Sequence, residues 1–306
     1  MLNQSIIDAA TKGFRAVFLK AYEGATPAWA PIAFEVESNS ATETYDFITG
    51  VPGMKELIGE VSIEELAAAG FSVTNKEWET TIGVKIADLE RDKLGLYGPS
   101  FQEMGDVARF HPQELVAALL DDSFTAKDYT GTAFFALNKP YDPNDKSKNA
   151  PTFSNKGTAA LDAASFLAAR TALKTMKNAK GKNLNLGNDL YLVVPPALEE
   201  TANKLRTAEL LPNAGGTATE TNTLRNTFKV LVLNQLSSAT AWFLIEGGRA
   251  MKPLVVQFEK RPEFIAGTDP KADYAIKQKR FLYQAYGRWN AGYALPQLAY
   301  GSTGAA

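Results

Sequence analysis

The segment from Phe71 to Gly98 alternates apolar and polar residues with the period of a half-buried β-strand. One face of its central part carries the apolar positions, which are Trp78, Thr80, Ile82, Val84 and Ile86. The other face is polar or charged and carries Glu77, Glu79, Thr81, Gly83 and Lys85. A two-stranded ribbon with a single apolar face is marginal alone in water. We therefore expect this ribbon to lie on its own domain or on a neighbouring copy of the chain.

The first 42 residues predict a helix followed by an extended arm. Apolar residues between Ile6 and Ala21 recur at the spacing of an amphipathic helix, which we expect to end near Gly24. The following stretch contains two prolines and a polar tract, which is typical of extended chain. Trp29 and Phe34 make this arm too apolar to be free in solvent, so it either crosses its own fold or binds a partner.

The middle of the chain predicts two helices separated by a loop. Residues 99–122 carry a helical apolar stripe, with Pro112 expected at the first helical position or at a kink. Residues 160–180 carry a second stripe, which ends at Gly181 after lysines that suit the C-terminal end of a helix. Between them, residues 137–156 are rich in Pro, Asn, Asp, Ser and Lys, which predicts a long solvated loop.

The C-terminal part is richer in strands. Residues 190–196 predict a buried strand, and residues 197–211 predict a helix with a charged outer face. Residues 212–227 have almost no apolar content and predict a mobile loop. Further strands are expected within the ranges 229–236, 240–247, 253–264 and 278–301. Because strands and helices do not alternate regularly, the expected fold class is α+β.

Composition narrows the class of protein. The 306 residues, 45% of them hydrophobic, are enough for a large core. The absence of cysteine excludes disulfides, thiolate metal sites and thiol catalysis. A formal net charge of -2 argues against a broad basic surface for nucleic acid and leaves room for a local patch. Neither a secretory signal nor an apolar run of about 18 residues is present, so we expect a protein of the cytoplasm without a membrane step.

No pattern predicts a catalytic, cofactor-binding or metal-binding residue. His111 is the only histidine, so a histidine-based triad and a two-histidine metal site have no support. The acidic positions Asp88, Glu90 and Asp92 lack the glycine and glutamate of a calcium loop, and no glycine-rich phosphate loop is present. A carboxylate-based hydrolase among the 34 acidic residues is an alternative without positive indication.

Several segments together resemble the major head subunit family of Mu-like tailed phages and prophages. The carrying segments are TETYDFITGVPGMKELIGE, NKEWETTIGVKIADLERDKLGLYG and MGDVARFHPQELVAALL. The likeness continues in the same order through YTGTAFFALNK, LYLVVPPALEETANKL and RFLYQAYGRWNAGYALPQLAYG. It covers most of the chain, and NKEWE and MGDVARFHP are its most specific pieces.

The resemblance implies the Hong Kong 97-type capsid fold. Residues 1–42 would then form an N-terminal arm, and residues 43–98 an extended two-stranded loop that reaches over a neighbouring subunit. Residues 99–189 would form a peripheral domain, with a spine helix within 101–122 or partly in 160–180. The remaining expectations are an axial domain at 190–264, with 212–227 as its mobile loop, and strands at 265–306 that return to the peripheral domain.

The resemblance also implies a structural protein that is not an enzyme and uses no cofactor. Its copies would form the hexamers and pentamers of an icosahedral head in the virion, assembled in the host cytoplasm around double-stranded DNA. A separate scaffold, a maturation protease, a portal and a decoration protein would be its other partners. The alternative is an accessory protein of the tail or of the shell exterior.

The residues that we expect at contacts between copies lie on the ribbon and the arm. They are Trp29, Phe34, Lys76, Glu77, Trp78, Glu79, Ile82, Val84, Lys85 and Ile86. Trp78→Glu, or removal of residues 72–86, should then leave a folded subunit that cannot close a shell. Lys76 is a candidate for a covalent crosslink between copies, although non-covalent locking is the default expectation.

Overall fold

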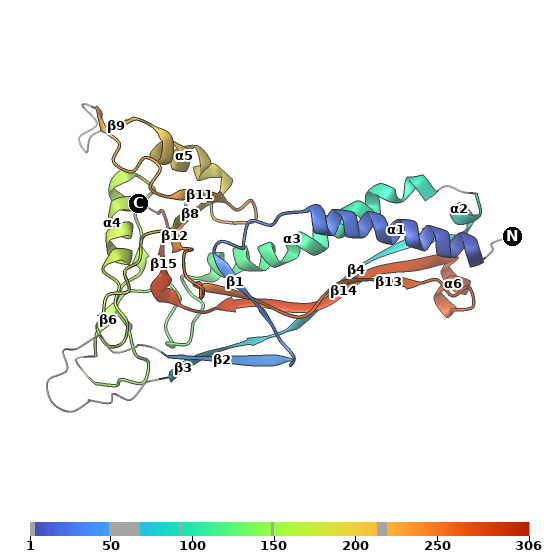
Figure 1. Ribbon diagram of the computed structural model, residues 1–306, viewed down its shortest axis with the longest axis horizontal. Coiled ribbons are helices and arrows are strands. Elements are labelled where there is room, and N and C mark those ends of the chain that lie inside the picture. The colour runs from blue at the N-terminus through green and yellow to red at the C-terminus, as the bar shows by residue number, and fades with distance from the viewer. Residues whose placement is uncertain (1–3, 49–67, 92–93, 148–149, 213–218, 306) are drawn as a thin grey trace.

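Two long antiparallel strands run through the molecule and organise most of its other elements (Figure 1). They are β13 (Leu254–Gly267) and β14 (Arg280–Tyr293). The computed structural model describes residues 4–48, 68–91, 94–147, 150–212 and 219–305. Within this part of the chain, β1 (Ala33–Glu37) and β4 (Lys76–Lys85) complete a four-stranded sheet of order β1-β13-β14-β4. This long sheet gives the molecule its elongated shape.

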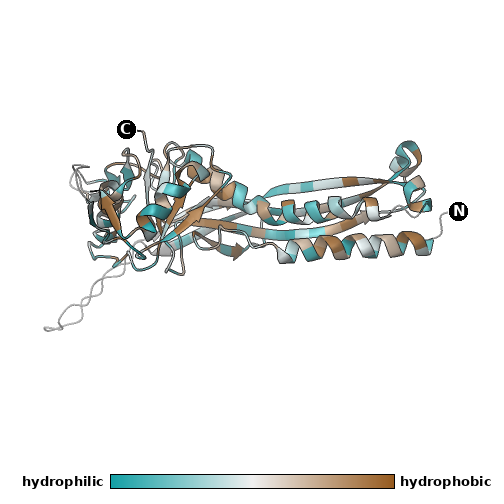
Figure 2. Ribbon diagram, turned by 90° about the horizontal axis from the view of Figure 1, so that it is seen from above, coloured by the Kyte–Doolittle hydropathy of each residue, from teal (hydrophilic) through white to brown (hydrophobic). Residues whose placement is uncertain are grey.

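Two helices lie side by side along the long sheet (Figures 1 and 2). They are α1 (Gln4–Gly24) and α3 (Gly98–Asp122). The helix expected near the N-terminus is thus present, and its apolar stripe buries Ile7, Ala10, Phe14 and Phe18. These side chains pack with Phe101 of α3 and with Phe281 and Tyr283 of β14, all of them fully buried. Apolar residues from three segments that are distant in the sequence thus pack into one core.

The connections at the far end of the long sheet are short. The helix α2 (Ile86–Glu90) and a 3₁₀ turn (Leu94–Leu96) lead from β4 to α3. The helix α6 (Asp273–Gln278) leads from β13 to β14 and ends at Lys279, which has a left-handed backbone conformation.

The position of Pro112 corrects one expectation. The first position of a helix is wrong, because α3 begins at Gly98 and Pro112 lies in its interior, whereas a kink at Pro112 stays a prediction. The residue at the start of the helix is Pro99, where the missing N–H costs nothing because no intrahelical partner exists there. Pro112 leaves one carbonyl of the preceding turn without its helical bond, and burial of Pro112 against the core accompanies this defect.

A second sheet forms the broader end of the molecule (Figure 1). It has five strands in the order β11-β8-β12-β15-β7, with bounds Lys229–Val232, Leu190–Val194, Trp242–Glu246, Ala299–Ser302 and Lys156–Gly157. The helices α4 (Ala163–Lys174) and α5 (Glu199–Thr207) pack on it through a shared apolar cluster. Short 3₁₀ turns at Pro196–Leu198 and Pro296–Leu298 precede α5 and β15.

Three two-stranded ribbons complete the described residues. They are β2 with β3 (Thr42–Ile48, Ala68–Thr74), β5 with β6 (Lys139–Pro140, Thr152–Phe153) and β9 with β10 (Leu210–Pro212, Thr219–Thr221). The expected ribbon from Phe71 to Gly98 is therefore wrong as a unit. Its first strand, β3, pairs with β2, which precedes it in the sequence. The strand β4 pairs instead with β14 in the long sheet.

The α+β class is confirmed and the long helix α3 covers the range 101–122 expected for a spine helix, but the expected domain limits cut through elements. The limit at residue 264 falls inside β13, which belongs to the long sheet rather than to the sheet that contains β8. Conversely, β15 lies in the range 265–306 expected to return to the peripheral domain, but it joins the five-stranded sheet that contains β8. The interval expected as a mobile loop, 212–227, contains β10 and the buried Leu224, while residues 213–218 lie outside the described part.

Candidate functional site

The strand β4 has one covered face and one exposed face. On the covered face, Val84 is fully buried beside α1, and Ile82 packs against the same cluster. On the exposed face lie Glu77, Glu79, Thr81 and Lys85, and Lys76 is exposed at the start of the strand. The alternation predicted from the sequence is confirmed, but the surface that covers the apolar face belongs to the same chain. Because β4 is the last strand of the long sheet, its second backbone edge faces no described strand.

Trp78, the most prominent residue of the predicted contact face, is held by neighbours within the chain. Its indole Nε1 donates a hydrogen bond to the carbonyl oxygen of Trp289, with 2.8 Å between the atoms. Its ring centroid lies 4.3 Å from that of His111. A half-buried Trp with these contacts joins β4 to β14 and α3, so it supports the fold of the subunit directly.

His111 completes this stack. The indole Nε1 of Trp289 donates to Nδ1 of His111 at 3.1 Å, so this ring nitrogen is an acceptor and carries no proton. Burial lowers the pKa of His111 below the ordinary value of 6.5, and the nearby Glu114 opposes this effect only in part. The imidazole is thus neutral and has a structural role in this stack.

A shallow groove of about 130 Å³ opens beside this stack. Its walls are largely apolar and come from β4, α3, β13 and β14. Val107 of α3, which is 47% exposed, forms part of the wall, together with Trp78 and Pro262. The lining includes no pair of carboxylates, and its one histidine is engaged, so the groove offers no catalytic arrangement.

The exposed carboxylate of Glu79 is held in place on the outer face of β4. It accepts hydrogen bonds from Gln284 Nε2 at 2.8 Å and from the hydroxyl of Thr81. These bonds, with the Gln284 bond contributing most, lower the pKa of Glu79. A carboxylate that is both ionised and oriented is available for contacts to another molecule.

The two arm residues of the predicted contact set lie inside the subunit. Trp29 is 5% exposed and belongs to the central apolar cluster. Phe34 lies in β1, which pairs in parallel with β13, and packs against the cluster of Phe71 and Val255. Of the two alternatives for the arm, it crosses its own fold. Ile86 is corrected in the same way, since it begins α2 and packs on the core beside α1.

The hairpin formed by β2 and β3 lies across the long sheet through a few polar and apolar contacts. The hydroxyl of Tyr45 donates to Gln257 Oε1 at 2.6 Å, and Asn290 Nδ2 donates to the carbonyl oxygen of Thr74 at 2.7 Å. Phe71 and Val73 bury their side chains at the same place. The hydrophobic pattern was not used to predict β2, although TETYDFI alternates; only the resemblance placed residues 43–98 in a two-stranded loop.

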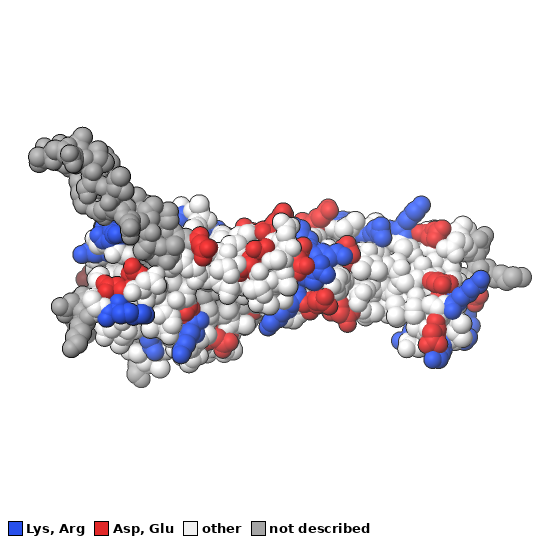
Figure 3. Space-filling model, turned by 90° about the horizontal axis from the view of Figure 1, so that it is seen from below, with Lys and Arg blue, Asp and Glu red and all other residues white. Residues whose placement is uncertain are grey.

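A belt of ion pairs crosses the long sheet where the register of β13 shifts. Arg261 pairs with Glu35 and Glu37 of β1, and Arg288 pairs with Glu259 at 2.8 Å. The shifts occur around Lys260, next to Pro262, which cannot donate to the ladder. Figure 3 shows acidic and basic side chains side by side across the middle of the molecule. Spacing alone could not reveal this belt, because its members come from three strands.

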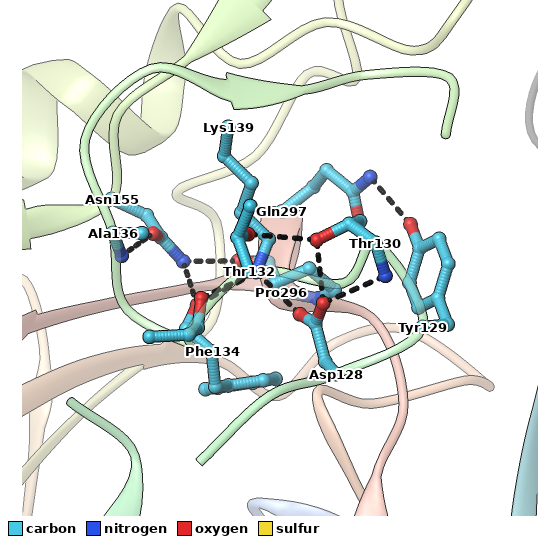
Figure 4. Close-up of polar contacts among 11 residues, drawn as sticks. Asp128, Tyr129, Thr130, Thr132, Phe134, Ala136, Lys139, Asn155, Pro296 and Gln297 are labelled. Carbon is cyan, nitrogen blue, oxygen red and sulfur yellow. Dashed lines mark hydrogen bonds and ion pairs between the residues drawn. The ribbon is translucent and has the colours of Figure 1, made fainter. Parts of the chain in front are cut away.

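The interval expected as a solvated loop, 137–156, contains a buried ion pair instead (Figure 4). The ammonium group of Lys139 has no exposed area and donates to Asp128 and to the carbonyl oxygens of Ala133 and Phe134. Burial lowers the pKa of Lys139, and the charge of Asp128 opposes this effect. Asn155, also fully buried, bonds to Phe134 and Pro296. This polar cluster ties the loop to the C-terminal segment, and its donors are all engaged.

Other candidate chemistry has a local explanation. Asp88, one of the three acidic positions, accepts a hydrogen bond at Oδ2 from the hydroxyl of Tyr97, with 2.7 Å between the oxygens. The described residues hold no group of three or more potential metal ligands. Among the helices of this part of the chain, none combines the length and the apolar character required to cross a membrane.

Comparison with known proteins gives a consistent result. The chain matches the family model described as Mu-like prophage major head subunit gpT over residues 7–167, 154–236 and 234–305. It is 28% identical over 293 residues to the major capsid protein of Escherichia phage Mu, covering 96% of this chain and 72% of that protein.

Solved structures extend the likeness to three dimensions. The procapsid of bacteriophage JBD30 matches with a TM-score of 0.62 and 27% identity, over 98% of this chain and 76% of that chain. The capsid of the same phage, decorated with minor capsid protein trimers, matches with a TM-score of 0.54 over 89% of this chain and 63% of that chain. Its identity of 20% supports the fold alone.

Proposed function

Because the chain belongs to the Mu-like prophage major head subunit gpT family and is therefore a major capsid protein, we propose that its copies form the hexamers and pentamers of a closed icosahedral head. The head would enclose double-stranded DNA. The match to a procapsid subunit over 98% of this chain is the observation that carries the proposal. The protein is structural and belongs to the virion, and assembly would take place in the cytoplasm of the host.

The exposed face and open edge of β4 are proposed as one contact surface between copies. Of the residues expected at such contacts, Lys76, Glu77, Glu79 and Lys85 are exposed on this strand. The other six support the subunit from within or at its edge, namely Trp29, Phe34, Trp78, Ile82, Val84 and Ile86. An open strand edge offers backbone donors and acceptors, and charged side chains on it select the partner and the register.

Because Trp78 supports the subunit itself, the variants suggested by the sequence do not test assembly. Removing residues 72–86 would delete most of β4, and Trp78→Glu would place a charge in the stack with His111. Both changes damage the subunit itself, so they cannot isolate a contact between copies. A variant on the exposed face is needed.

The test reverses two exposed charges, with Glu77→Lys and Glu79→Lys in one chain. Circular dichroism should show a folded subunit, while negative-stain electron microscopy should show closed shells for the unchanged protein and few or none for the variant. The matched control, Glu77→Asp with Glu79→Asp, keeps both charges and should form shells. Normal shells from the charge-reversed variant would remove β4 from the proposed contacts.

The further partners are proposed from family membership. A separate scaffold, a maturation protease and a portal are proposed as further components of the assembling head. A decoration protein is also proposed, since the capsid of JBD30 carries minor capsid protein trimers.

A further inference from the structure

One segment of the chain is basic without any acidic residue. Residues 163–188 contain five basic side chains, at Arg170, Lys174, Lys177, Lys180 and Lys182, and no Asp or Glu. The whole chain has a formal net charge of -2, so this stretch departs strongly from the average. The sequence analysis left room for a local basic patch, and this segment is the candidate.

The fold holds these lysines in a compact arrangement at the end of α4. After the helix ends at Lys174, the chain makes a tight reversal in which Lys177 and Asn183 face each other as an antiparallel bridge. The side-chain amide of Asn183 donates to the carbonyl oxygen of Lys174, and Asn178 Oδ1 accepts from the backbone of Lys182. The turn is therefore ordered by its own hydrogen bonds and packs on the core through Met176, which is 2% exposed.

Three lysines of this turn are exposed to solvent. Lys174, Lys177 and Lys182 are exposed, and no described residue forms an ion pair with any of them. Arg249, also exposed, reaches the same turn and donates to the carbonyl oxygen of Leu184. Figure 3 shows several Lys and Arg side chains over the end of the molecule that contains the five-stranded sheet.

The acidic groups around the turn are already engaged. Glu246, which is 2% exposed, accepts backbone N–H groups of Gly187 and Asn188. Asp189 pairs with Lys229 at 2.8 Å. In the adjacent loop, Asp145 accepts the backbone N–H of Ser147. The exposed side chains of Lys174, Lys177 and Lys182 are therefore available to a group outside the subunit.

We propose that Lys174, Lys177 and Lys182, with Arg249, bind the phosphate backbone of double-stranded DNA inside the head. Flexible lysines contact phosphates without reading bases, which suits DNA of any sequence. A protein partner is less suited to them, because Lys is depleted in protein interfaces and these side chains surround no apolar patch of the turn. The inference rests on the proposed function, since it assumes that the head encloses DNA.

The test measures binding of the full-length subunit to a short DNA duplex of mixed sequence by fluorescence anisotropy at several salt concentrations. The changed chain carries Lys174→Ala, Lys177→Ala and Lys182→Ala. Each lost phosphate contact should make the slope of log affinity against log salt shallower by about 0.9, so the triple change should reduce it by about 2 to 3. A second duplex of different sequence should give the same result.

The matched control removes three exposed lysines from the other end, with Lys12→Ala, Lys20→Ala and Lys271→Ala. Its net charge equals that of the test variant, yet its salt slope should stay close to that of the unchanged chain. An equal loss in both variants, or no loss in either, would overturn the inference.

Electron microscopy of the same samples separates this inference from the proposed function. If the unchanged protein forms no shells, the proposed function fails whatever the DNA measurement shows. If the lysine variant binds DNA normally but no longer forms shells, the lysines contact another copy and the inference is wrong.

Discussion

At the scale of single residues, the stack of Trp78, His111 and Trp289 requires that the imidazole of His111 be neutral. The Nδ1 atom of His111 accepts the indole proton of Trp289, and a protonated imidazole could not do so. Burial opposes the charged form in addition, which is why the pKa of His111 is lowered.

This arrangement predicts a pH dependence of stability. In the unfolded chain, His111 takes up a proton as the pH falls below about 6.5, whereas in the folded chain it stays neutral to a lower pH. The unfolded state therefore binds more protons in this window. The stabilisation is complete above pH 6.5 and is lost as the pH falls through the lowered pKa. The loss amounts to about 1.4 kcal/mol for each pH unit that separates the folded pKa from the unfolded one.

Urea unfolding of the dilute subunit at pH 7.5, 6.5 and 5.5 measures this effect. The free energy of unfolding should fall more steeply with acid for the unchanged chain than for His111→Gln, which keeps an acceptor for Trp289 but does not titrate. Parallel curves for the two chains would contradict the role given to His111.

At the scale of elements, the approach of α1 to α3 depends on a glycine. A Cβ atom at Gly105 would lie 2.5 Å from the carbonyl oxygen of Phe18 and 2.9 Å from the Cβ of Ala21. The first of these atoms is backbone, so the clash cannot be relieved by rotating a side chain. The two helices touch closely because this position has no side chain.

Gly105→Ala should therefore destabilise the subunit by about 1 to 2 kcal/mol, since the cost of overpacking exceeds the gain in helix propensity. Thermal unfolding followed by circular dichroism measures the effect. Gly13→Ala on α1 is the matched control, because no atom lies within 4 Å of a Cβ there, and it should be neutral or stabilising by up to about 1 kcal/mol. A stabilised Gly105→Ala chain would show that the helices can separate freely.

The elements also show which sequence signals were sufficient. The spacing of Ile7, Ala10, Phe14 and Phe18 predicted α1, and the alternation after Trp78 predicted β4 with the right inner face. Both signals are local, since each needs only that one face be covered. The partner of each element is not local, and for this reason β3 was paired with β4 instead of with β2. The buried Lys139 was missed because its partner Asp128 and its carbonyl acceptors come together only in the folded loop.

At the scale of the whole molecule, two sheets meet end to end in an elongated subunit with its termini at opposite ends (Figure 1). The N-terminal helix lies along the narrow part, and β15 closes the broad part. A shape of this kind has a large surface for its mass, and self-assembly can bury much of that surface.

The subunit structure predicts that the shell is locked without covalent bonds. The candidate Lys76 lies exposed at the start of β4, where water keeps its ammonium group solvated and no described carboxylate pairs with it. Purified shells boiled in detergent should migrate on a denaturing gel as single chains of 33.2 kDa. A ladder of multiples that disappears with Lys76→Arg would identify a crosslink.

The sequence by itself determined the α+β class, the amphipathic helix at the N-terminus, the spine helix, the inward face of β4 and the family of the chain. These properties follow from residues close together in the sequence or from the order of motifs. Only the tertiary structure decided that the subunit covers Trp29, Phe34 and Val84 itself, that β2 pairs with β3, and that Lys139 is buried. The physical reason is that the hydrophobic effect favours burial of an apolar face against any apolar surface, so the pattern does not identify that surface. In the same way, a strand needs backbone hydrogen bonds, but its sequence does not name the strand that supplies them.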